Sequence, residues 1–396
     1  MKILFIVQGE GRGHLTQALA LQTMLCGAGH ELVGVLAGNV RNREIPEVFA
    51  QRINVPIRRF GSPGFSIGKE QRAINSLDTL IENVERIPAF KRSLKILDHT
   101  IKTVQPDLVL TFYEPMAGVY QAFYRPNVPF VAVGHQYMFD HPVYEFAPGR
   151  PVDRSAMRLF TRLTGFRATW KLALSLYPAE DLPDARLSVI PPLLREEALT
   201  LQNNRVQEDF FLIYLLNRGY AEQVIEWHEK HPTQRLECFW DNPEVDDIVE
   251  YSETLRFNRL HDTRFLELMS RCSGLVCTAG FESVSEALFL GKPVLAVPVE
   301  GHYEQLCNAF EIEKMGCGIR SDKFDMNLLT KFTAQHDATR DDFRRWVLKA
   351  EKRVLSILEA IGTDHLPSTG STLSGPEHPQ KLAPPASPPK LPEANS

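Results

Sequence analysis

Two glycine-containing loops in this sequence carry side chains that could hold an anionic ligand and move a proton. The first loop is GEGRGH, in which Gly11, Arg12, Gly13 and His14 follow an apolar run and precede a helical pattern. Glycines let the backbone approach a ligand closely, and free amides at a helix start attract an anion or a sugar hydroxyl. Histidine side chains titrate near neutral pH, so His14 could act as a general base on an acceptor hydroxyl. The alternative is that His14 only caps or packs the loop.

The first loop does not fit a dinucleotide-binding fingerprint. That pattern, G-x-G-x-x-G, requires a glycine at the position that His14 occupies. A nicotinamide-dependent enzyme is therefore disfavoured.

The second loop is TAGFESVSEAL, over residues 278–288. Gly280 permits a tight turn from strand to helix, and the amides of Gly280, Phe281, Glu282 and Ser283 would then face a diphosphate. We expect the Glu282 carboxylate to point aside, because it would repel that diphosphate. Glu286, one turn further along, could accept hydrogen bonds from both hydroxyls of a ribose.

Further polar side chains follow apolar runs elsewhere in the chain. Glu304, Gln305 and Asn308 belong to a polar stretch over residues 298–308, where the first two could sort sugar hydroxyls. In the first half, polar residues after two further apolar runs would open onto the same cleft as His14 and could contact an acceptor: Glu114, His135 and Gln136. Hydrogen bonding within loops is the alternative for all of these residues.

The elements that must position these loops alternate between short apolar runs and helical patterns. In the first half we expect strands over residues 3–7, 31–36, 108–112, 130–133 and 187–190, and helices over 15–27, 77–104 and 146–176. In the second half we expect strands over residues 211–216, 236–239, 274–277 and 293–297, and helices over 221–231 and 340–361. This alternation predicts two α/β domains with parallel sheets, over residues 1–177 and 178–362. The last helix could pack back on the first domain. Residues 363–396 are proline-rich and predict a disordered tail.

Composition excludes several classes of protein. The chain has 396 residues, of which 43% are hydrophobic and 23% charged, and its net charge of -5 gives no general attraction to nucleic acid. The six cysteines form no C-x-x-C pair, which favours a reduced, cytoplasmic compartment. The chain contains no apolar run of about 18 residues, the length of a membrane span, and its first residues read as a strand, not a signal peptide.

The motifs together resemble a known family. The runs SVSEAL, GKPVLAVP, EQLCNA and EKMGCG, with GEGRGH near the start, are similar to the MurG-like glycosyltransferases and the related UDP-glycosyltransferases over about residues 1–360. The resemblance implies the GT-B fold, in which two Rossmann-like domains face each other across a cleft. It implies a nucleotide-diphosphate-sugar donor, most simply a UDP-sugar, with no metal and no cofactor.

The resemblance also assigns roles to individual residues. It implies that Glu286 holds the donor ribose and that Glu304 and Gln305 hold the donor sugar, although the family has two glutamines there, which leaves the sugar open. Arg218, in a loop that corresponds to a glycine-rich donor loop, could contact phosphate. The base-reading segment should lie near residues 257–260.

The sequence thus predicts an inverting, metal-independent glycosyltransferase. The acceptor could be a glycan, a lipid-linked molecule or a small molecule. Two alternatives stay open: a nucleotide-sugar 2-epimerase of the same fold, and a sugar- or nucleotide-binding module without turnover. The basic stretch 52–102 could bind anionic lipid as a peripheral membrane contact, or could be an ordinary solvated helix face.

Overall fold

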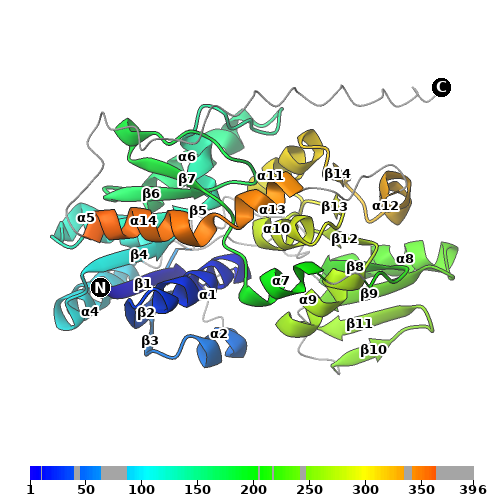
Figure 1. The fold of residues 1–396 in the computed structure, drawn as a ribbon, viewed down its shortest axis with the longest axis horizontal. Helices are drawn as coiled ribbons and strands as arrows, with labels where there is room; N and C mark the ends of the chain where they lie inside the picture. The colour runs from blue at the N-terminus through cyan, green and yellow to red at the C-terminus, as the bar shows by residue number, and fades with distance from the viewer. Residues whose placement is uncertain are drawn as a thin grey trace.

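The computed structural model describes most of the chain as a two-sheet α/β protein (Figure 1). The described residues are 1–9, 11–39, 45–63, 87–203, 206–215, 218–240, 247–333 and 341–362. The expected disordered tail at 363–396 lies outside them, as do residues 77–86 of an expected helix, Glu10 and Asn217.

The first sheet has seven strands, all parallel, in the order β3-β2-β1-β4-β5-β6-β7. The strands are β1 Lys2–Gln8, β2 Glu31–Asn39, β3 Ile57–Gly61, β4 Leu108–Phe112, β5 Phe130–Gly134, β6 Trp170–Leu174 and β7 Leu187–Ile190. The helices of this half are α1 Arg12–Gly27, α2 Glu47–Arg52, α4 Ile87–Val104, α5 Pro115–Tyr124, η1 His135–Asp140, α6 Pro151–Thr164 and η2 Pro183–Ala185. Alternate residues of β1 enter different cores: Phe5 packs with α1, and Leu4 packs with α4 and α5.

The second sheet also has seven strands, in the order β10-β11-β9-β8-β12-β13-β14, and only β10 runs antiparallel to its neighbour. The strands are β8 Phe210–Leu215, β9 Arg235–Trp240, β10 Ile248–Glu250, β11 Leu255–Arg259, β12 Gly274–Cys277, β13 Val294–Ala296 and β14 Gly318–Arg320. The helices are α7 Glu196–Thr200, η3 Leu201–Asn203, η4 Arg218–Tyr220, α8 Ala221–Lys230, α9 Asp262–Arg271, α10 Phe281–Phe289, α11 Tyr303–Lys314, α12 Met326–Thr333, α13 Asp341–Val347 and α14 Ala350–Gly362. One core cluster runs from β1 and α1 into α9 and α10, so the two halves share buried apolar contacts.

Two sequence-based expectations for the first half need correction. The expected helix over residues 146–176 is wrong, because α6 ends at Thr164 and residues 170–174 form the buried strand β6 between β5 and β7. The expected boundary at residue 177 also falls inside the first sheet, which β7 completes further along the chain.

The chain returns to the first half at its described end. The expected single helix over residues 340–361 is two helices, α13 and α14. Arg353 of α14 donates from Nε to the carbonyl oxygen of Val189 in β7 at 2.7 Å, so α14 lies against the first sheet (Figure 1). Among the described helices, none combines the length and apolar character that crossing a membrane requires.

Candidate functional site

Each sheet reverses its strand order at one point, and the two loops from the sequence analysis lie at these points. The order reverses between β1 and β4 in the first sheet and between β8 and β12 in the second. Ligands of such sheets bind beyond the carboxyl ends of the strands at this position. At each of these points, one of the two strands is followed by a non-glycine residue with a left-handed backbone. These residues are Tyr113 after β4, with φ 52°, and Ala279 after β12, with φ 58°. Strained residues of this kind mark functional turns in many proteins.

His14 lies at the start of α1, in the first of these two places. Its ring stacks on that of Tyr113, with centroids 5.5 Å apart, and its Nδ1 lies 3.4 Å from Oε1 of Gln17. Gln17 Nε2 donates to the Glu282 carboxylate of α10, in the other half of the molecule. Because the amide oxygen of Gln17 only accepts, this arrangement places a proton on His14 Nδ1 and leaves Nε2 as the basic atom.

Glu282 joins the two glycine loops. Its carboxylate lies directly against Gly13, where a Cβ atom would overlap it, and so reaches the N-terminal turn of α1. Burial raises the pKa of Glu282, while the charge of His14 and hydrogen bonds from its own amide and Gln17 act to lower it. The carboxylate therefore reaches across to the other domain while it also engages its own amide in the first turn of α10.

Those amides are arranged to meet an anion. Gly280 is the N-cap residue of α10 and Gly11 that of α1, and neither helix start has a side-chain cap. Ser283 Oγ donates to the carbonyl oxygen of Gly280 at 3.2 Å, so in this orientation the hydroxyl does not cap the first amides of α10. Asn308 Nδ2 donates to the carbonyl oxygen of Ala279 at 3.0 Å and so holds the strained turn. Uncapped helix N-termini are common sites for phosphate.

A second bridge between the halves lies beside the first. Gln136 Nε2 donates to Glu304 Oε1 at 2.9 Å, which links η1 to the start of α11. Gln305, by contrast, turns inward: its Oε1 accepts from the amide of Val299 at 2.9 Å. His302 caps α11 by accepting from the amide of Gln305, and burial lowers the pKa of His302, which keeps its ring neutral and able to accept. Glu304 thus faces the cleft, whereas the Gln305 oxygen holds the loop.

Glu286, expected to hold a donor ribose, is engaged by an arginine in this structure, and the ribose contact stays a prediction. Both of its carboxylate oxygens accept hydrogen bonds at 2.7 Å from Arg195, and both side chains are buried. Arg195 comes from the segment between β7 and α7, and its Nη1 also lies 3.8 Å from Asp262. The bidentate pair with Arg195 fixes this buried carboxylate in place and uses one acceptor site on each oxygen.

Two of the expected acceptor residues are also internal. Glu114 is 0% exposed and caps α5, with Oε1 accepting from the amide of Met116 at 3.0 Å and from Ser62 Oγ at 2.5 Å. His135 is likewise 0% exposed, and its ring stacks on Phe281 at 4.0 Å between centroids. These two side chains pack the interior and do not open onto the cleft.

The remaining predicted positions are placed as follows. Arg12 Nη1 donates to Asp262 Oδ1 at 3.4 Å, again across the two halves. Arg218 begins η4, but its side chain is outside the described structure. The expected base-reading residues 257–260 cover the end of β11 and the residue after it. In the basic stretch 52–102, the exposed basic side chains that the structure describes include Lys91, Arg92 and Lys95 of α4. Contact of this stretch with a membrane stays a prediction. No three His, Cys, Asp or Glu side chains of the described chain are grouped to hold a metal ion.

Sequence reasoning missed three residues of this site: Gln17, Tyr113 and Arg195. Gln17 is 1% exposed inside an otherwise apolar stretch of α1, and a lone glutamine in such a stretch was the available signal. Tyr113 follows a strand directly, which was a weaker signal. Arg195 gave none, because its partner Glu286 is far away in the sequence.

Comparison with known proteins gives a consistent result. A family model described as Glycosyl transferase family 1 matches residues 1–336. A curated relative, an uncharacterized glycosyltransferase of Methanosarcina acetivorans, is 28% identical over 342 residues, which cover 81% of this chain and 83% of the relative.

Solved structures share the architecture. The glycotransferase of kitacinnamycin is similar with a TM-score of 0.59 and 17% identity, over 92% of this chain and 99% of that one. MurG of Acinetobacter baumannii is similar with a TM-score of 0.54 and 15% identity, over 90% of this chain and 99% of that one. With the two doubly wound sheets, these likenesses confirm the expected GT-B fold.

Proposed function

The chain belongs to glycosyl transferase family 1, and from that premise we propose that it transfers a sugar from a UDP-sugar to an acceptor hydroxyl, with inversion and without a metal. The observation that carries this proposal is the meeting of His14 with the N-terminal turn of α10 across the two halves, through Gln17 and Glu282. A base and an anion site on opposite walls are what a direct displacement needs.

In the proposed step, Nε2 of His14 takes the proton of the acceptor hydroxyl as its oxygen attacks the anomeric carbon. A new bond from carbon to the acceptor oxygen forms while the bond from that carbon to the diphosphate oxygen breaks on the opposite face. One displacement of this kind inverts the configuration of the anomeric carbon. The proton on Nδ1, which faces Gln17 Oε1 at 3.4 Å, keeps Nε2 free to accept.

The amides at the start of α10 would carry the charge that develops on the departing diphosphate. Gly280 caps this helix without a side-chain hydrogen bond, and Asn308 fixes the turn before it. Amides held in place before the reaction stabilise such charge without reorganising. Glu282 reaches toward α1 through Gln17 and engages only its own amide, so the other amides at the start of α10 are left for the diphosphate.

Glu304 is the residue we assign to the donor sugar. It is partly exposed, and its Oε1 accepts from Gln136, which leaves its other oxygen to accept from a sugar hydroxyl. Gln136 would then set the position of Glu304 from the acceptor side of the cleft.

The test is product analysis with UDP-sugars and a panel of glycan, lipid-linked and small-molecule acceptors. We expect release of UDP together with a glycoside of inverted configuration, and loss of about two to four orders of magnitude in rate for His14→Ala. The control is His99→Ala, because His99 is exposed on α4 away from the residues described above. An isomerised sugar nucleotide would instead indicate an epimerase. Tight UDP binding by the unmodified protein, with no product from it or from His99→Ala, would indicate a binding module.

A further inference from the structure

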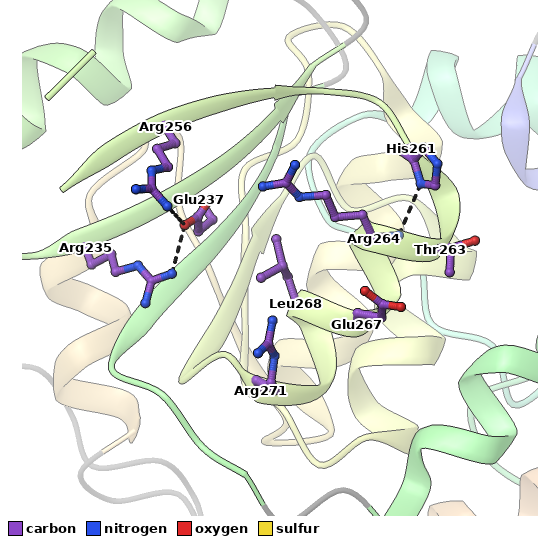
Figure 2. Close-up of a pocket in the computed structure, with 9 residues that line it drawn as sticks. All are labelled: Arg235, Glu237, Arg256, His261, Thr263, Arg264, Glu267, Leu268 and Arg271. Atoms are coloured by element: carbon purple, nitrogen blue, oxygen red, sulfur yellow. Dashed lines mark hydrogen bonds and ion pairs between the residues drawn. The ribbon is translucent and has the colours of Figure 1, made fainter. Parts of the chain in front are cut away.

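A pocket of about 340 Å³ lies on the second domain, and Figure 2 shows the side chains that line it. It opens between helix α9 and the sheet face formed by β9 and β11. None of the residues assigned above to donor or acceptor lines it. Its walls carry four arginines: Arg235 and Arg256 from the sheet, and Arg264 and Arg271 from the helix.

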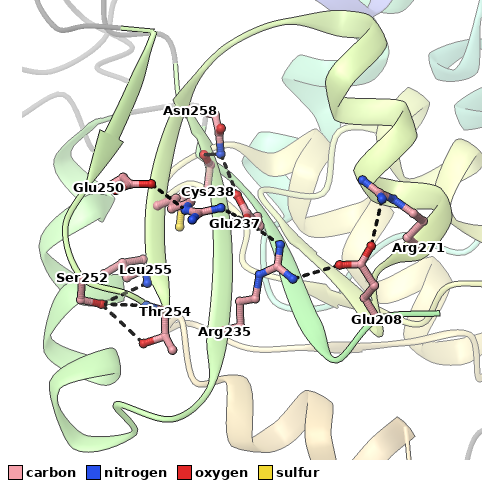
Figure 3. Close-up of polar contacts among 11 residues, drawn as sticks. Glu208, Arg235, Glu237, Cys238, Glu250, Ser252, Thr254, Leu255, Asn258 and Arg271 are labelled. Atoms are coloured by element: carbon pink, nitrogen blue, oxygen red, sulfur yellow. Dashed lines mark hydrogen bonds and ion pairs between the residues drawn. The ribbon is translucent and has the colours of Figure 1, made fainter. Parts of the chain in front are cut away.

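The sheet side of the pocket is a chain of shared ion pairs (Figure 3). Glu237 lies on the floor and is 1% exposed, and it accepts from Arg235 Nη2 at 3.0 Å and from Asn258 Nδ2 at 3.1 Å. Arg256 Nη1 also lies 3.8 Å from the same carboxylate. Because this buried carboxylate is engaged by its neighbours, the floor presents guanidinium groups, not free oxygens, to the pocket.

A second carboxylate, that of Glu208, is also shared between two arginines of the pocket. Glu208 pairs with Arg235 through one carboxylate oxygen and with Arg271 through the other, both at 2.9 Å. Glu250 also pairs with Arg256 Nε at 3.2 Å, so Glu208, Glu237 and Glu250 together meet three arginines: Arg235, Arg256 and Arg271. Each guanidinium has five N–H donors in a planar fork, and one or two ion pairs leave several of these donors unused.

Arg264 adds a cation that has no acidic partner among the residues the structure describes. It is half-buried, it extends from α9 toward the sheet in Figure 2, and no carboxylate among the described residues lies within ion-pair distance of its guanidinium. Glu267, also on α9, points away from the arginines of the sheet (Figure 2). A half-buried cation without a counter-charge is costly unless an anion completes its surroundings.

We propose that this pocket binds the phosphoryl group of a small phosphorylated molecule, at a site separate from the cleft. Guanidinium groups from two facing walls match a tetrahedral anion with several acceptor oxygens, and arginine is the usual partner where phosphate is bound in a defined geometry. Leu268 is the one apolar side chain of the lining, so the pocket offers little surface to a base or a lipid tail. The ligand is therefore small and highly charged.

The test is a calorimetric titration of the full-length protein with pyrophosphate, repeated with inorganic phosphate. We expect saturable binding that Arg264→Gln weakens by about tenfold or more, since it removes charged hydrogen bonds to the anion. Arg264 forms no ion pair with the described part of the chain, so this variant should fold normally. The matched control is Arg259→Gln on β11, which removes one charge close by but outside the lining.

Three results would overturn the proposal. One is an absence of saturable binding to the unmodified protein at millimolar pyrophosphate. Another is equal weakening by Arg264→Gln and Arg259→Gln, which would mean general electrostatic attraction. The third is binding that neither variant changes, which would place the anion elsewhere, for example at the start of α10. Because the readout is anion affinity, failure here leaves the glycosyl transfer proposal standing, and unchanged transfer in His14→Ala, which would count against that proposal, leaves this one standing.

Discussion

Arg195 holds both carboxylate oxygens of Glu286: its Nε and Nη2 each donate a hydrogen bond of 2.7 Å. The pair is buried, and it ties the segment between the two sheets to the middle of α10. Glu286 is thus committed to the position of the helix whose N-terminus we assign to the diphosphate.

Glu286→Gln should therefore act on stability and not on nucleotide binding. The change leaves the Arg195 guanidinium buried without its counter-charge, and breaking such a pair costs about 3 kcal/mol or more of unfolding free energy. Urea unfolding measures this loss, and a thermal shift with UDP should show undiminished protection. In the control Glu313→Gln, which breaks a half-exposed pair with Arg320 at 3.9 Å, the loss should stay below about 1 kcal/mol. Normal stability with lost UDP protection would return Glu286 to a ribose-reading role.

Gln17→Met should lower kcat while leaving KM nearly unchanged. The variant removes the oxygen that faces His14 Nδ1 and the amide that donates to Glu282, so the histidine ring is no longer held in one orientation. Misplacing a reacting group costs up to about a hundredfold in rate. Steady-state kinetics measures the change.

The matched control for this variant is Gln22→Met on the same helix. Gln22 donates to the carbonyl oxygen of Ile53 at 3.2 Å, away from His14. Equal kinetics for the two variants would show that Gln17 supports the helix and does not position the base.

Most central strands were predictable, with bounds correct or off by one to three residues, because buried parallel strands appear as continuous apolar runs. The run over residues 108–112 gave β4 with the correct bounds. Residues 170–174 are interrupted by Lys171 and follow a helical pattern closely, and periodicity alone does not separate a short buried strand from a helix end. The edge strand β3 was missed because its sequence, IRRFG, carries two arginines.

The loops of the site were predictable in position but not in their partners. The glycines of both loops and His14 could be identified from the sequence, because glycines between an apolar run and a helical pattern indicate a tight turn from strand to helix. The contacts of Gln136 with Glu304 and of Arg195 with Glu286 depend on how distant segments dock, and neither has a local signal. The same reason explains why Glu114 and His135 appeared to face the cleft: position after a strand does not decide whether a side chain points outward or inward.

The stability of the fold should depend on pH through His135. Burial acts to lower the pKa of His135, but the nearby carboxylate of Glu311 and the hydrogen bond to the carbonyl oxygen of Leu174 outweigh burial, and the pKa is raised. His135 Nε2 lies 3.4 Å from Glu311 Oε2. A histidine whose pKa is higher in the folded than in the unfolded state adds stability below the unfolded value of about 6.5. That stability is lost as pH rises through the folded value.

The comparison is between the unmodified protein and Glu311→Gln, which removes the counter-charge. The unfolding free energy of the unmodified protein should exceed that of the variant by most at pH values below about 6.5, and by progressively less toward alkaline pH. Denaturant unfolding at a series of pH values measures the difference. A difference that is constant, or that grows with pH, would show that the buried pair does not hold a proton on His135.

Gly13→Ala should uncouple the two glycine loops. A Cβ atom at Gly13 would overlap the Glu282 carboxylate, so Glu282 must move away from α1 and from Gln17. Because this contact sets both the His14 orientation and the distance between the base and the start of α10, we expect kcat/KM to fall by about tenfold or more. Gly27→Ala is the control: it lies at the end of the same helix, and nothing stands within 4 Å of its added Cβ. If kcat/KM is the same in the two variants, the close approach of Glu282 to Gly13 has no part in catalysis, and the proposed coupling between base and anion site loses its support.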